Sequence, residues 1–196
     1  MEEIRVNRLP AITWRYLHVN DSPDQFEFPG NSASAVFSDK RYVSEGGTLP
    51  TDFCGASAET LAAAEKGQAY TVIIPENTEA ELTISITAEE DRPDFAGCFI
   101  FKLEKGAKLK LIWRLSGDRK HSVFATASSY ELMENAVLSV SYLETGLPAS
   151  SLYEQRYAVL GNEAKLDFVS AELGGEKVIV HSYGTVSYTP LTLPTI

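Results

Sequence analysis

The sequence predicts an all-β protein, a parallel β-helix in which the chain winds as a single-stranded solenoid. Four similar corner motifs carry this prediction, at residues 77–82, 106–109, 135–138 and 162–166, and each opens an alternating strand. Their leading leucines, at positions 82, 109, 138 and 166, are 27, 29 and 28 residues apart. Such intervals are typical of repeat architectures, in which stacked neighbours supply one another's core.

The strands show an alternation of apolar and polar residues with a period of two. Leu82, Ile84 and Ile86 alternate with polar residues, and a similar alternation follows the next two corners. A second short strand precedes each corner, for example at residues 70–74 and 98–103. If the corners were hairpin turns, the product would be an antiparallel sandwich. We favour the stack, because only a stack requires one corner motif to recur at near-constant intervals.

Residues 1–69 are expected to form an irregular and helical cap. Thr13 is a candidate N-cap for a short helical turn. The segment 21–55 is rich in Asp, Ser, Pro and Gly, whereas residues 56–66 combine high helix propensity with a glycine just beyond as a stop. The β-helix core is therefore assigned to residues 70–184.

Composition limits the classes of function. The chain has 196 residues, which is enough for one domain with a substantial core. An excess of 27 acidic over 17 basic residues gives a net charge of −10, which disfavours a nucleic-acid partner. The sequence has no long apolar stretch and no secretory signal at its N-terminus. We therefore expect a cytoplasmic protein that does not bind membranes.

No residue pattern indicates catalysis or metal binding, so the chain is not expected to be an enzyme. Cys54 and Cys98 lack CxxC spacing and are expected to be small buried side chains. The glycine pairs at 46–47 and 174–175 lack the context of a phosphate-binding loop. No GxSxG motif supports a hydrolytic triad. The acidic run at 89–91, with the Arg-Pro-Asp that follows it, is interpreted as a solvated loop.

Two aromatic and three acidic strand residues are candidates for ligand or catalytic groups. Trp113 and Tyr142 are expected to pack in the core. A carbohydrate-acting β-helix enzyme would need paired carboxylates on one face of the stack. Glu81, Asp167 and Glu172 are the strand-associated acids available, but they fall at unlike positions of the predicted repeat. They are therefore not expected to line one groove.

Two stretches resemble the SufB/SufD family, the scaffold proteins of SUF-type iron–sulfur cluster assembly. One is residues 7–14 (NRLPAITW) with Leu17 and Asn20, and the other is residues 165–175 (KLDFVSAELGG). The resemblance extends over residues 4–184 and implies a right-handed parallel β-helix. It also implies a non-catalytic, SufD-like scaffold. Such a scaffold pairs with a homologous β-helix subunit, as a homo- or heterodimer, and binds an ABC-type ATPase subunit.

In this family the cluster-related residues lie in later coils and near the subunit interface. The resemblance therefore places the iron–sulfur cluster in the complete complex and no cofactor in this fragment. His181 matches no functional histidine of the family and is expected to be an ordinary strand residue. Residues 186–196 (VSYTPLTLPTI) resemble the translation of a transposon-end sequencing adapter, so 185–196 is expected to be a non-native tail on a truncated chain. A carbohydrate-acting enzyme and a purely structural assembly module are the alternatives.

Overall fold

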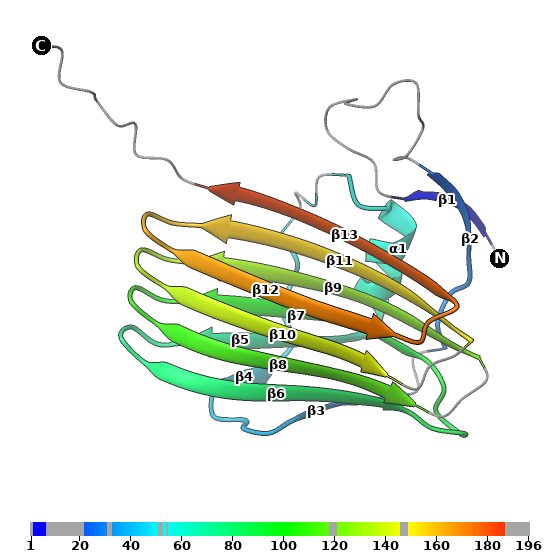
Figure 1. The fold of residues 1–196 in the computed structure, drawn as a ribbon, viewed down its shortest axis with the longest axis horizontal. Coiled ribbons are helices and arrows are strands. Elements are labelled where there is room, and N and C mark those ends of the chain that lie inside the picture. Colours follow the sequence, from blue (N-terminus) through cyan, green and yellow to red (C-terminus); the bar gives the residue numbers. More distant parts are fainter. Residues whose placement is uncertain are drawn as a thin grey trace, which may run out of the picture.

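The chain forms a parallel β-solenoid of about four turns, seen in a computed structural model (Figure 1). The structure describes residues 2–6, 22–30, 33–50, 53, 55–117, 121–145 and 149–186. The elements are β1 (Glu2–Val6), β2 (Ser22–Phe26), β3 (Ala35–Phe37), β4 (Val43–Glu45), α1 (Ala58–Lys66), β5 (Gln68–Ile74), β6 (Glu79–Ala88), β7 (Phe95–Leu103), β8 (Lys108–Gly117), β9 (Ser122–Leu132), β10 (Val137–Thr145), β11 (Ser150–Leu160), β12 (Lys165–Leu173) and β13 (Lys177–Val186).

Two facing sheets make up the solenoid, and each coil adds one strand to each of them. The five-stranded sheet has the order β12-β10-β8-β6-β3, and the six-stranded sheet has the order β13-β11-β9-β7-β5-β4. Strands of successive coils pair in parallel, which confirms the predicted stack. At one end, β3 and β4 pair antiparallel with β6 and β5 and so close the stack.

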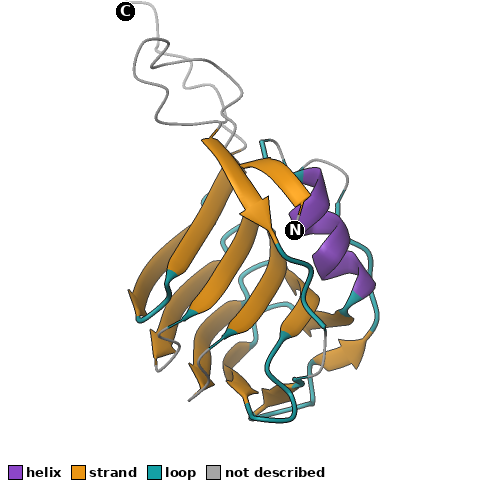
Figure 2. Cartoon of the chain, turned by 90° about the vertical axis from the view of Figure 1, so that its right-hand side faces the viewer, coloured by secondary structure: helices purple, strands orange, loops and turns teal. Residues whose placement is uncertain are grey.

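The two sheets differ in what covers their outer faces. Buried and exposed residues alternate in β6, β8 and β10, as expected when one face meets the core and the other meets solvent. By contrast, β7, β9 and β11 are buried along nearly their whole length. The reason is that α1 and the β1–β2 hairpin pack on their outer face (Figure 2). The N-terminal region thus covers a side of the solenoid as well as one end.

The helix α1 has the sequence signals expected of it. The Ser57 hydroxyl caps its N-terminus by accepting a hydrogen bond from the Thr60 backbone N–H, and Gly67 ends it. Gly67 has no room for a side chain, because a Cβ there would lie 2.1 Å from the carbonyl oxygen of Ala96. The candidate N-cap Thr13, the thiol of Cys54 and residues 187–196 lie outside the described residues.

Each tight corner is a β-turn whose third residue has a positive φ. These residues are Asn77, Gly106, Asn135 and Glu163, with φ values of 53°, 67°, 58° and 55°. Glycine and asparagine suit this conformation, which explains the recurring motif. The corners are also bonded from coil to coil. For example, the Gly106 N–H donates to the Glu134 carbonyl at 2.9 Å.

The repeat interval at the first step differs from the predicted 27 residues. Leu109 pairs with Ala80, not with Leu82, so the first interval is 29. Leu109 then pairs with Leu138, and Leu138 pairs with Leu166. The prediction was wrong because the corner, and not the leucine, sets the register of the strand. In the first unit, Ala80 occupies the inward position just after the corner. In the last corner the residue with positive φ is Glu163, one position after the asparagine of the motif.

Replacing the strained corner residue should stabilise the fold. Glu163→Gly removes a side chain from the left-handed region, so we expect the free energy of unfolding to rise by about 0.5–1 kcal/mol, measured by urea denaturation. Asn162→Gly is the matched control, because the φ of Asn162 is not positive, and it should lower stability. A loss of stability in Glu163→Gly would contradict the assigned corner.

Candidate functional site

The last described coil ends in an open groove. No described strand pairs with the outer edge of β12 or of β13. Between these strands lies a cavity of about 530 Å³, here called the end groove. Apolar side chains make up most of its wall, and its lining includes Arg156, Leu160, Leu166, Phe168, Gly184 and Val186.

The groove lies where the described residues leave part of the core uncovered. Leu138 and Val140 are fully buried, whereas their neighbours in β12, Leu166 and Phe168, are only partly buried. On the outer face of the same strand, Val169 is 69% exposed. An apolar surface of this kind on a sheet edge is typical of an interaction site.

Charged residues replace apolar ones inside the solenoid as it approaches the groove. Along the six-stranded sheet, Arg156 follows Phe99 and Ser128 at the same inward position. Its guanidinium donates through Nε and Nη2 to the two carboxylate oxygens of Glu154, at 2.8 and 2.7 Å. It also lies 4.0 Å from the centre of the Phe168 ring. A bidentate pair of this kind is strong and geometrically specific.

Two further carboxylates face this pair. Glu172 of β12 approaches Arg156 Nη2 at 3.7 Å. Glu144 of β10 lies beside Glu172 in register and is fully buried. Burial raises the pKa of Glu144, and the nearby Glu172 raises it further. The backbone N–H groups of residues 173–175 oppose this rise, although none makes a hydrogen bond of good geometry with the carboxylate.

The tyrosines beside this cluster are held neutral. Burial raises the pKa of Tyr142 well above its ordinary value, and Glu154 adds to the effect. Burial also raises the pKa of Tyr130. As predicted, Tyr142 and Trp113 pack in the core, where they are 5% and 2% exposed. The aromatic side chains beside the Glu154–Arg156 pair are therefore uncharged.

The three acids weighed from the sequence do not form a carboxylate pair. Glu81 and Asp167 occupy equivalent outward positions, with Lys110 and Ser139 between them, so the prediction that all three positions differ was wrong. Three strand spacings still hold Glu81 and Asp167 about 14 Å apart. Glu81 is paired with Lys110 at 3.2 Å. Glu172 lies on the opposite, inward face of the sheet.

Cys98 and His181 lie on the covered outer face of the six-stranded sheet, where both are buried. Burial raises the pKa of the Cys98 thiol to about 12, so it is protonated and unreactive at neutral pH. Within the described ranges, no group of three or more His, Cys, Asp or Glu side chains could hold a metal ion.

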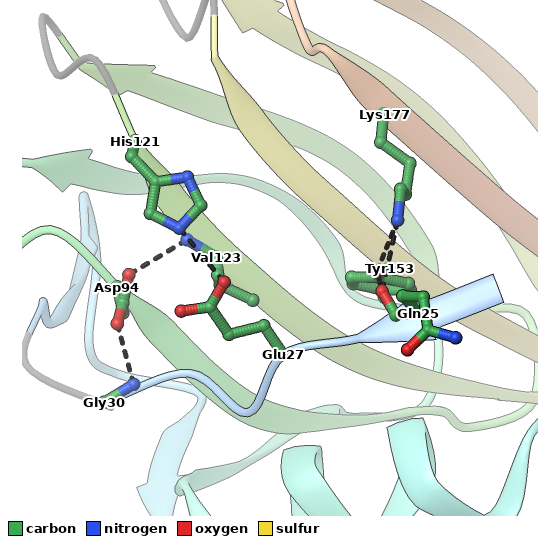
Figure 3. A network of polar contacts seen from close by, with 8 residues as sticks. All are labelled: Gln25, Glu27, Gly30, Asp94, His121, Val123, Tyr153 and Lys177. Atoms are coloured by element: carbon green, nitrogen blue, oxygen red, sulfur yellow. Dashed lines mark hydrogen bonds and ion pairs between the residues drawn. The ribbon is translucent and has the colours of Figure 1, made fainter. Parts of the chain in front are cut away.

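Asp94, predicted to lie in a solvated loop, makes two hydrogen bonds to the backbone of other segments. Its Oδ2 accepts a hydrogen bond from the Gly30 N–H at 2.8 Å, and its Oδ1 accepts one from the Val123 N–H at 2.9 Å (Figure 3). Glu154 and Arg156 were not predicted as site residues. The available signal was a pair of charged residues, two positions apart, in the middle of a largely apolar strand.

No protein-family model, curated protein or solved structure matches the chain. The fold therefore defines the class of protein, a parallel β-solenoid. Among its described strands, β3 and β4 close one end of the stack, and β12 and β13 have unpaired edges at the other. Within the part of the chain that the structure describes, no helix is long and apolar enough to cross a membrane.

Breaking the internal ion pair should destabilise the protein strongly. Arg156→Met leaves Glu154 buried without its counter-charge, so we expect a loss of about 3–5 kcal/mol in the free energy of unfolding. The double variant Glu154→Gln/Arg156→Met removes both charges and should lose clearly less. Guanidinium denaturation of the three proteins measures this. Equal losses in the single and double variants would show that the charge pairing is not the cause.

Glu144 should make stability depend on pH. Because its pKa is raised in the folded state, its contribution is complete below the ordinary value of 4.5 and is lost as the pH rises through the raised pKa. Glu144→Gln stays neutral, so this variant should have the higher Tm at pH 8 and a flatter Tm profile between pH 4 and 8. A wild-type advantage at pH 8 would mean that Glu144 is bound as a carboxylate.

Proposed function

We propose that this chain is part of a non-catalytic scaffold for SUF-type iron–sulfur cluster assembly in the cytoplasm. It pairs there with a homologous β-helix subunit and with an ABC-type ATPase subunit. The observation that carries the proposal is the difference between the two ends of the stack. One end is closed by β3 and β4, whereas the last described strands at the other end border an open apolar groove.

The open end has the chemistry of a protein-binding surface. The free edge of a strand presents backbone N–H and C=O groups that a strand of another subunit can pair with. The half-buried Leu166 and Phe168 supply apolar surface beside that edge. A second β-helix would pair with the free strand edge and cover the apolar surface beside it, because its end strands offer backbone groups at the same spacing.

A binding role agrees with the state of the polar groups near the groove. Arg156 and Glu154 hold one another, and Tyr130 and Tyr142 are neutral at physiological pH. Cys98 is buried and protonated, so it is not proposed as a ligand of the cluster. Cluster ligation is assigned to other parts of the complete complex.

Gly184 allows a matched test of the groove. A Cβ at this position would meet nothing closer than Ala158 O at 3.8 Å, so the backbone accepts a side chain. Gly184→Arg places a charge in the groove, and it should weaken association with the β-helix subunit more than tenfold. Gly184→Ala should retain association. Size-exclusion chromatography and titration calorimetry with the purified β-helix and ATPase subunits measure both.

The outcomes separate the proposal from its alternatives. The scaffold is supported if the wild type binds both subunits and Gly184→Arg loses binding to the β-helix subunit only. Binding of neither subunit overturns it. Self-association without ATPase binding supports the purely structural module. Turnover of polysaccharides by the wild type supports the carbohydrate-acting enzyme.

A further inference from the structure

A short N-terminal segment crosses the starts of four successive strands of the six-stranded sheet. We call residues 24–30 the strap. Its contacts move down the stack in order, from β13 and β11 at residues 24–25, to the start of β9 at Glu27, and to the start of β7 at Gly30. Figure 3 shows the strap beside the strands that it touches.

One end of the strap holds the two outermost coils together. Lys177, the first residue of β13, donates to Asp24 Oδ1 at 2.7 Å, and the Tyr153 hydroxyl of β11 donates to Asp24 Oδ2 at 2.9 Å. Lys177 also donates to the Gln25 carbonyl at 3.2 Å, and the Tyr153 hydroxyl oxygen lies 3.2 Å from the same carbonyl oxygen. Phe26 is fully buried against the Tyr153 ring, with the ring centres 4.8 Å apart. Two coils are therefore fixed to the same few strap residues.

The other end of the strap is fixed by Asp94, which binds the Gly30 N–H with one oxygen and the Val123 N–H with the other. Between the two ends, Glu27 lies 3.2 Å from His121 Nε2. The lengths agree. The six steps from residue 24 to 30 span about 20 Å when extended, and the three strand spacings from β7 to β13 span about 14 Å.

The strength of these contacts is uneven along the strap. The side chains of Lys177 and Asp24 are 33% and 15% exposed, whereas those of His121 and Glu27 are 60% and 51% exposed. Exposed ion pairs contribute little, because water and salt screen them. The strap therefore holds most firmly at β13, the strand that borders the end groove.

We propose that the strap is a clamp that holds the last described coil on the stack. Its release at Asp24 frees β13 and opens the end groove while the first coils stay folded. Lys177, at the start of β13, is thus tied to a residue 153 positions earlier in the chain, in addition to the pairing of β13 with β11. This inference does not depend on the function proposed above.

Amide hydrogen exchange of the full chain, followed by mass spectrometry of its peptides, tests the clamp. Asp24→Asn keeps the side-chain shape but removes the charge that faces Lys177. Exchange in β13 should become at least about tenfold faster, while exchange in β7 should stay at the wild-type rate. Lys177→Met should have the same effect. Glu27→Gln is the control on the strap, and it should leave β13 unchanged.

Two results would overturn the clamp. One is that β13 exchanges at the wild-type rate in both Asp24→Asn and Lys177→Met. The other is equal acceleration in β7 and β13, because that would mean a general loss of stability. Faster exchange limited to β13, with the control unchanged, supports it.

Discussion

Parallel pairing in register between successive coils is the constraint on which the rest of this structure depends. Every coil must place its corner over the previous corner, because a shift of one residue would turn the inward side chains outward. The four corner residues with positive φ meet this requirement, and backbone hydrogen bonds run from corner to corner. The inward columns of side chains follow from that alignment, and so do the core and the charged cluster near the groove.

The interior of the solenoid holds different kinds of side chain in different coils. Early coils fill the inward positions with aromatic rings such as Phe99 and Trp113, whose centres are 4.6 Å apart. Later coils place Glu154 and Arg156 at the corresponding height. Burying charges costs free energy unless they pair well, so the loss of one partner from this pair is costly.

The parts of the fold that repeat could be predicted from the sequence, because a repeated corner with alternating strands has few structural solutions. The parallel stack and the core positions of Trp113 and Tyr142 were predicted correctly. The register of the first unit was not, since Ala80 stands where later coils have leucine. Nor could the sequence show the strap, because the link between Asp24 and Lys177 joins residues that share no local pattern. Glu154 and Arg156 lie on one strand, but Glu144 and Glu172, which complete the charged cluster, come from other strands and share no local sequence pattern with them.

Coverage of the six-stranded sheet by α1 and the β1–β2 hairpin has a geometric consequence for any larger assembly. With that flank occupied, a neighbouring molecule can approach along the exposed flank of the five-stranded sheet or head-on along the axis on which the coils stack. Head-on contact at the last described coil would extend the stack, whereas flank contact would widen it.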